Sequence, residues 1–175
     1  MDDPRYVHHE DPFRTPEAAR EPARRFRGRL PAPVTIWTSG APDEPSGLTV
    51  ASILIAEGDP SHVLGLINDL TDLYDKIIDT RTFVVHVASR EQRVLADRFA
   101  GLWPSPGGLF ADLEVATSEW GPVLVDVPNR AFCRFVEAQE VGYQRLVRAE
   151  IETLELESAG DPLVHFRGSY RGLTD

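Results

Sequence analysis

Short runs of β-forming residues, each closed by glycine, proline or a polar turn, recur from Val34 to the end of the chain. Such runs are typical of strands joined by turns. They lie at residues 34–38, 46–60, 62–67, 82–89, 114–120, 123–127, 131–139, 145–157 and 162–173. The regular alternation of strand and helix that a doubly wound sheet needs is missing. We therefore expect a mainly β fold with helical insertions, built as a β-barrel.

Three segments have helical patterns. Residues 16–28 combine helix-forming Ala, Arg and Glu, with Thr15 as the expected N-cap and Pro22 making the helix short or broken. Residues 69–80 and 90–101 space their apolar side chains at helical intervals. In the strand at 145–157, the apolar positions change phase between Ile151 and Leu154, which predicts a β-bulge.

Length and charge restrict the organisation and the partners. We expect a polar leader with a short helix at residues 1–29, followed by one main domain at residues 30–175. A net charge of -10 disfavours nucleic acid and anionic membranes as partners. No run reaches the roughly 20 apolar residues of a membrane span, and the N-terminus has no apolar signal core, so we expect a cytoplasmic protein.

The metal-binding and thiol side chains indicate structural roles. Cys133 lies among apolar neighbours and is predicted to be a buried structural cysteine. His8 and His9 are adjacent in a polar leader without a second cluster, so no metal site is expected. His86 and His165 lie in strands, where a histidine hydrogen-bonded within the fold is the commoner outcome.

One strand is unusual in its side chains. The stretch SGLTVASILIAEGDP, residues 46–60, carries Thr49, Ala51 and Ser52 where an ordinary core strand has bulky residues. Small residues let a ligand approach the backbone, and hydroxyl groups can donate to an anion. The alternative is that Thr49 and Ser52 hydrogen-bond to neighbouring strands.

Four segments together resemble the flavin reductase-like proteins, whose fold is an FMN-binding split β-barrel. The first is PVTIWTSG, residues 33–40, and the second is SGLTVASILIAEGDPSHVLGLIND, residues 46–69. The third is FVVHVASREQRVLADRFAG, residues 83–101, and the fourth is PLVHFRGSYRGL, residues 162–173. They follow the order and the spacing of that family.

This resemblance implies a flavin site on the first strands. The residues expected to face FMN, or FAD in its place, are Thr38, Ser39, Thr49, Val50, Ala51, Ser52 and Asn68. Backbone amides near Val50 and Ala51 would bond the polar edge of the ring, and Asn68 offers both a donor and an acceptor. The alternative for Asn68 is to cap the helix that follows it.

The flavin phosphate also needs a cation. The chain has 18 lysine and arginine residues, of which only Lys76 is a lysine. Arg81, Arg90 and Arg93 flank the strand before the third helix, and we select Arg90 as the phosphate partner.

The chain departs from the family pattern at one place. A Gly-Asp-His segment is typical of these reductases, with its histidine on the nicotinamide side of the flavin. Here Gly142 is followed by Tyr143 and Gln144. Gln144 therefore takes the nicotinamide-side position, where its neutral amide would weaken turnover.

Two functions follow from the resemblance. The first is an NAD(P)H:flavin oxidoreductase, using NADH or NADPH and supplying reduced flavin to a partner monooxygenase. The second is a flavin carrier or sensor without efficient NAD(P)H turnover. A third hypothesis is a β-barrel interaction protein without a cofactor. The resemblance also implies a homodimer, which the apolar loop GLWPSPGGLF, residues 101–110, supports.

Overall fold

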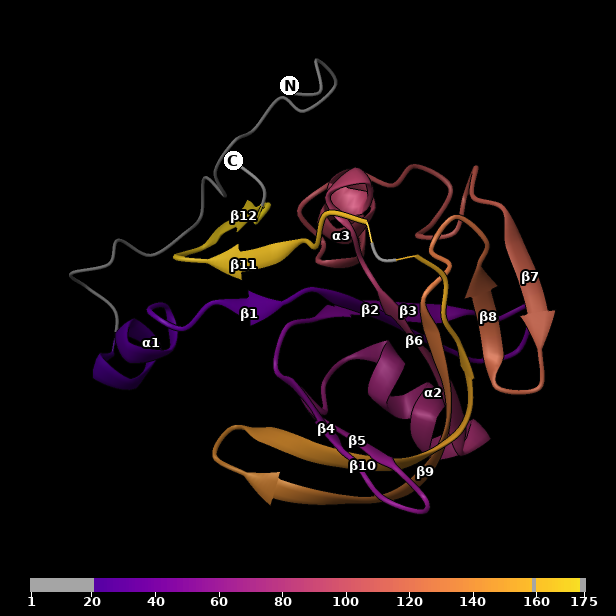
Figure 1. Ribbon diagram of the computed structural model, residues 1–175. Helices are drawn as coiled ribbons and strands as arrows, with labels where there is room; N and C mark the ends of the chain where they lie inside the picture. Colours follow the sequence, from indigo (N-terminus) through magenta and orange to yellow (C-terminus); the bar gives the residue numbers. More distant parts are fainter. Residues whose placement is uncertain (1–20, 159, 174–175) are drawn as a thin grey trace.

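The computed structural model describes residues 21–158 and 160–173, and a curled antiparallel sheet dominates it (Figure 1). The sheet has seven strands in the order β3-β2-β6-β9-β10-β5-β4. Their bounds are β2 Thr35–Ser39, β3 Ser46–Val50, β4 Ile53–Ala56, β5 His62–Ile67, β6 Thr82–Val87, β9 Arg130–Val141 and β10 Gln144–Glu155. The expected mainly β architecture with helical insertions is confirmed.

The sheet closes on itself at a break between β3 and β4. β3 pairs with β2 at one edge of the sheet, and β4 pairs with β5 at the other edge. Only Ala51 and Ser52 separate the two strands along the chain. Because the chain passes directly from one edge to the other, the sheet becomes a barrel, as the resemblance implied.

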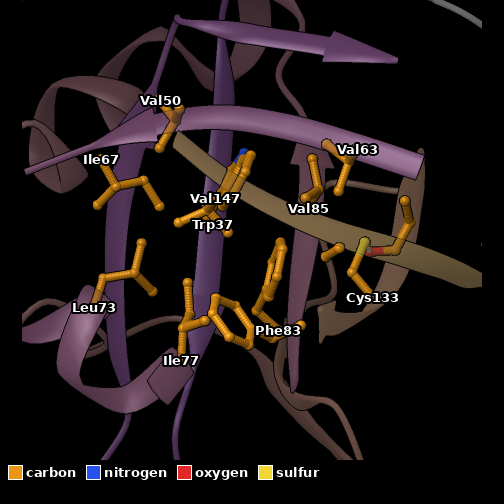
Figure 2. Packing of buried hydrophobic residues seen from close by; sticks show 13 residues of the cluster. Trp37, Val50, Val63, Ile67, Leu73, Ile77, Phe83, Val85, Cys133 and Val147 are labelled. Atoms are coloured by element: carbon orange, nitrogen blue, oxygen red, sulfur yellow. Dashed lines mark hydrogen bonds between the residues drawn. The ribbon is translucent and has the colours of Figure 1, made fainter. Parts of the chain in front are cut away.

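The barrel encloses the main hydrophobic cluster, which α2 (Asp72–Thr80) completes at one end. Figure 2 shows Trp37 in the middle of this cluster, between Val50 and Phe83. Trp37 is fully buried and stacks on Phe83, with ring centroids 4.7 Å apart. Leu73 and Ile77 bring the apolar side of α2 into the same cluster. Figure 1 shows α2 inside the curl of the sheet.

Smaller elements lie outside the barrel. β1 (Ala32–Pro33), β11 (Val164–Phe166) and β12 (Ser169–Arg171) form a three-stranded sheet, and β7 (Val115–Ser118) pairs with β8 (Gly121–Leu124). The helical elements are α1 (Pro22–Arg27), the 3-10 turn η2 (Arg90–Gln92) and α3 (Arg93–Phe99). Among the described helices, none is long and apolar enough to cross a membrane.

Several predicted boundaries were wrong in detail. The first described helix is short, as expected, with 6 residues, and Pro22 is its first residue, where no N–H donor is needed. Thr15 and residues 16–20 lie outside the described residues. The run at 46–60 is two strands, and the strand expected at 123–127 lies earlier, at Gly121–Leu124.

The predicted bulge in β10 is confirmed. Ile151 pairs with Cys133 and Thr153 pairs with Phe132, so Glu152 is an extra residue at the phase change that the apolar pattern shows. A second register shift lies between Arg148 and Ala149. Both let the long β9–β10 pair bend around the barrel.

Part of the apolar loop at residues 101–110 is packed inside the molecule, while Leu102 is 49% exposed. Leu109 and Phe110 pack against the buried cluster around Ile36 and Phe99. The rings of Phe99 and Phe110 meet edge to face with centroids 5.2 Å apart. The apolar residues at this end of the loop are used inside the molecule.

Candidate functional site

The break between β3 and β4 leaves backbone polar groups unpaired. Ser52 O accepts from Leu66 N at 3.0 Å. Within the described residues, no protein partner exists for the N–H of Ala51, the carbonyl of Ala51, the N–H of Ser52 or the Ser52 hydroxyl. Ala51 and Ser52 are half-buried, so this segment is not sealed inside the core. Unpaired donors and an acceptor on adjacent residues suit a ring with a mixed polar edge.

The two residues before the break have different roles. Val50 is buried and points into the barrel, and its carbonyl accepts from Thr35 Oγ1 at 2.6 Å. Thr49 belongs to the same strand, and its hydroxyl donates to Ala96 O of α3 at 2.6 Å. The single hydroxyl proton of Thr49 is therefore used to hold α3 against the barrel.

Asn68 lies directly after β5 and is exposed. Its Oδ1 accepts from Leu70 N at 2.9 Å, and its carbonyl accepts from Thr71 Oγ1 at 2.7 Å. The N-cap of α2 is Thr71, so Asn68 forms the turn before the helix rather than capping it directly. Within the described part of the chain, the amide nitrogen of Asn68 has no partner.

Gln144 lies beside Asn68 at the same end of the barrel. Arg145 pairs with Ile67 across β10 and β5, so the next position in register places Gln144 opposite Asn68. Ser52 joins them through its bond to Leu66, one residue before Ile67. The structure thus brings together Ser52, Asn68 and Gln144, which come from three separate parts of the sequence.

Thr38 and Ser39 lie at the opposite end of the β2–β3 hairpin. Ser39 pairs with Ser46, four residues before Val50, which corresponds to about 13 Å along the strand. Both side chains are fully buried. The Thr38 hydroxyl donates to Pro122 O at 2.5 Å and the Ser39 hydroxyl donates to Thr82 O at 2.7 Å. The structure does not bring these two residues to Ser52.

A surface hollow of about 260 Å³ lies at this opposite end. It is formed by the turn after β2 and by the β7–β8 hairpin, and residues such as Gly40, Pro45 and Pro122 line it. Its walls carry no charged side chain. It therefore provides no cation for a phosphate.

Arg90 begins η2 and is exposed. Its guanidinium lies 3.5 Å from Asp161 Oδ2, and its N–H donates to Asp161 O at 2.8 Å. By contrast, the Arg81 guanidinium lies over the ring of Phe135, 4.2 Å from the centroid. Arg90 and Arg81 are both exposed, and each guanidinium already has a contact within the protein.

The cations nearest to Gln144 are already paired. Arg145 Nε lies 2.9 Å from Asp69 Oδ2, and Arg145 NH1 lies 3.3 Å from Glu140 Oε2. The hydrogen bond that Arg145 donates to Asp69 raises the pKa of Arg145 above its ordinary value. Arg148 in turn pairs with Glu137 at 3.0 Å. This end of the barrel therefore offers little free positive charge.

His86 and Cys133 are structural. His86 Nε2 accepts from Leu124 N and its Nδ1 donates to Ile36 O, both at 3.0 Å, so the ring is neutral. Burial lowers the pKa of His86 from 6.5 to about 4. Burial likewise raises the pKa of the Cys133 thiol. In the part of the chain that the structure describes, no three His, Cys, Asp or Glu side chains are placed to hold a metal ion.

Thr35, near the break, was missed by the sequence analysis. Thr35 and Trp37 are joined by a hydrogen bond at 3.0 Å and lie behind Val50. Both belong to the first predicted strand, and no local pattern distinguishes them from ordinary core residues. The hydrogen bond from Thr35 to Val50 O joins β2 to β3, so only the pairing of the strands reveals their role.

Comparison with known proteins gives a consistent result. A family model described as "Flavin reductase like domain" matches residues 27–174. The chain is 31% identical over 169 residues to the NADH-dependent FMN reductase AsuE2 of Streptomyces nodosus subsp. asukaensis, covering 94% of this chain and 91% of that protein. It is 29% identical to the reductase component of 4-nitrophenol 4-monooxygenase/4-nitrocatechol 2-monooxygenase of Rhodococcus opacus, covering 84% of this chain and 77% of that protein. The solved structure of the flavin reductase PheA2 superimposes with a TM-score of 0.78 at 25% identity, covering 87% of this chain and 97% of that one.

Proposed function

Because the chain belongs to the flavin reductase like domain family, we propose that it transfers a hydride from NAD(P)H to a flavin bound at the break between β3 and β4. The placement of the flavin rests on the unpaired polar groups of Ala51 and Ser52. These two residues connect β3 and β4, the strands at the two edges of the sheet. A flavin supplies the hydride-accepting ring when it is bound.

The residues of this chain bind and orient the ring. The N–H groups of Ala51 and Ser52 donate to its acceptors, and the carbonyl of Ala51 accepts from its donor. Asn68 and Ser52 add side-chain bonds, while Gln144 contacts the nicotinamide side. Thr38, Ser39 and Thr49 act indirectly, because their hydroxyl protons are bonded to carbonyl groups of the protein. Arg90 remains the proposed phosphate partner.

The proposed substrates are FMN and NADH. The relative AsuE2 is named an NADH-dependent FMN reductase, and this supports both choices. Arg145 and Arg148 are paired with carboxylates, so an additional phosphate, as on NADPH, would find little free positive charge near Gln144. The cytoplasmic location and the leader-domain boundary at residue 29 stay predictions.

A partner monooxygenase is the proposed destination of the reduced flavin. The 4-nitrophenol relative is named as the reductase component of a monooxygenase, which supports this use. The second candidate function, a flavin carrier without efficient turnover, is favoured by the neutral Gln144 amide.

Titration of the protein with FMN tests the site. Ser52→Ala removes a hydroxyl donor, and loss of one hydrogen bond is expected to weaken FMN binding about threefold to tenfold. Ser61→Ala is the matched control, because the Ser61 hydroxyl bonds only to the backbone of Gly58 in an exposed turn. Equal FMN affinity in both variants would remove Ser52 from the site.

Assays of NADH and NADPH oxidation with FMN and with FAD test the reaction itself. We expect the highest kcat/KM with NADH and FMN. A protein that binds flavin but oxidises neither nucleotide would establish the carrier function instead.

A further inference from the structure

Thr35 lies directly behind the break and fixes the residue that precedes it. Its side chain is buried, and Oγ1 donates its only proton to Val50 O at 2.6 Å. The same oxygen accepts from Trp37 Nε1 at 3.0 Å. A hydroxyl with a fixed acceptor and a fixed donor has one orientation. The carbonyl of Val50 is therefore held by a side chain and not by the sheet ladder alone.

Trp37 contacts both sides of the break, since it bonds Thr35 and its ring lies against β5. Its ring has no exposed surface and stacks on Phe83, so its position is set by the core (Figure 2). The far edge of the ring lies against Gly65 of β5, where an added Cβ would be 2.5 Å from Trp37 Cη2. Gly65 precedes Leu66, whose N–H donates to Ser52 O at 3.0 Å.

The backbone of Ala51 is thus held from both directions. Val50 O is held by Thr35, and Ser52 O is held by Leu66, while the polar groups between them have no partner in the described residues. A short segment with restrained ends and unpaired groups is preorganised for a ligand. The restraint comes from residues that lie inside the barrel and do not reach the surface.

We infer that Thr35 is a positioning residue for flavin binding, which sets the direction of the Ala51 and Ser52 amides through its bond to Val50 O. The inference rests on the proposed function, because it takes flavin as the ligand of those amides. Trp37 acts through Thr35 by holding its hydroxyl. Thr35 itself does not touch the flavin.

The experiment compares three substitutions in the full-length protein. Thr35→Val keeps the shape of the side chain but removes the hydroxyl, and we expect the FMN dissociation constant to rise about tenfold. We also expect the absorption spectrum of FMN at saturation to change, since it depends on the hydrogen bonds to the ring. Thr35→Ser restores the hydroxyl and is expected to restore both measurements.

Thr82→Val is the matched control. Thr82 is also a buried strand threonine whose hydroxyl lies 3.4 Å from a carbonyl oxygen on another segment, that of Glu119. We expect its loss to lower the melting temperature without changing the saturated FMN spectrum. A merely structural role of Thr35 would give the same result as this control.

The outcomes separate the inference from the function on which it rests. Wild-type protein that takes up no FMN overturns the proposed function and the inference with it. Wild-type protein that binds FMN, with an unchanged dissociation constant and spectrum in Thr35→Val, overturns the inference alone. If Thr35→Val does not fold, Trp37→Phe replaces it, since it removes the N–H that orients Thr35. Unchanged FMN binding and spectrum in Trp37→Phe would then overturn the inference.

Discussion

At the scale of single residues, the candidate site residues differ in whether their hydroxyl group already donates a hydrogen bond within the protein. A serine or threonine has one proton to donate, and Thr38, Ser39 and Thr49 each donate it to a carbonyl of the protein. The Ser52 hydroxyl has no partner among the described residues, and its role toward a ligand stays a proposal. Residues of one chemical type in neighbouring strands therefore have different uses.

Gln144 permits a prediction about the rate. Its amide is neutral and cannot supply the charge that a histidine can, so we expect slow NADH oxidation. Gln144→His is expected to raise kcat/KM a few-fold, mostly through a lower KM for the nucleotide. Steady-state oxidation of NADH with FMN measures this. A wild-type kcat at or above about 10 per second would show that Gln144 is no handicap.

His86 permits a prediction about acid stability. Its pKa is about 4 in the folded protein because of burial first and the nearby Arg130 second, while the bond to Ile36 O opposes the shift. The unfolded chain binds the proton near pH 6.5, so the unfolded state gains protons first as the pH falls. Stability is therefore present above pH 6.5 and is lost between pH 6.5 and 4.

Urea unfolding of wild type and His86→Gln measures this loss. We expect the free energy of unfolding of wild type to fall by about 2 kcal/mol from pH 7 to pH 5 through His86 alone. His86→Gln removes that titration and is expected to be less dependent on pH, although it is less stable at pH 7. Parallel pH profiles for the two proteins would contradict the assignment.

At the scale of elements, the bulge in β10 matters more than the side chain in it. Glu152 bonds Arg134 and Trp120 at the surface, with its pKa lowered chiefly by the hydrogen bond from Arg134. Its second role is to be the extra residue between Ile151 and Thr153. Without that residue, every side chain from Thr153 onward would change faces of the strand.

Deletion of Glu152 and the substitution Glu152→Ala separate these roles. The substitution removes a surface ion pair and is expected to cost about 1 kcal/mol or less. The deletion also moves the side chains from Thr153 onward to the opposite faces of β10, so we expect a clearly larger fall in the melting temperature. Thermal unfolding followed by circular dichroism provides the comparison, and equal melting temperatures would show that the register shift can be absorbed.

At the scale of the whole molecule, the barrel leaves apolar surface uncovered. β4 is one of the two edge strands of the seven-stranded sheet, and Leu54 and Ile55 in it are 71% and 57% exposed. Leu70 and Tyr143, at the end of the barrel near Gln144, are 88% and 94% exposed. Exposed apolar residues on an unpaired edge are typical of an interface.

We therefore keep the prediction of a homodimer, on a different surface from the loop at residues 101–110. Sedimentation of the wild type is expected at twice 19.5 kDa. Leu54→Glu places a charge on the β4 edge and is expected to shift the protein toward the monomer. Leu102→Glu, on that loop, is the control with a similarly exposed leucine. A wild-type monomer would refute the prediction.

The sequence by itself located most of the strands and their order along the chain. β5 was predicted with its observed bounds, β2 was predicted one residue too early, and the phase change after Ile151 located the bulge. These features depend on neighbours along the chain, where side-chain periodicity and turn residues act directly. The family resemblance could also be detected in the sequence, because its motifs are short local segments.

Only the tertiary structure decided which polar groups stay free for a ligand. Thr49 and Ser52 look alike in the sequence, yet one donates to α3 and the other has no partner among the described residues. Ser52, Asn68 and Gln144 lie at the same end of the barrel because β5 pairs with both β4 and β10. A hydroxyl group donates to an acceptor that is near in space, and the closure of the strands into a barrel decides which acceptor that is. For Thr49 the acceptor, Ala96 O, lies 47 residues away along the chain.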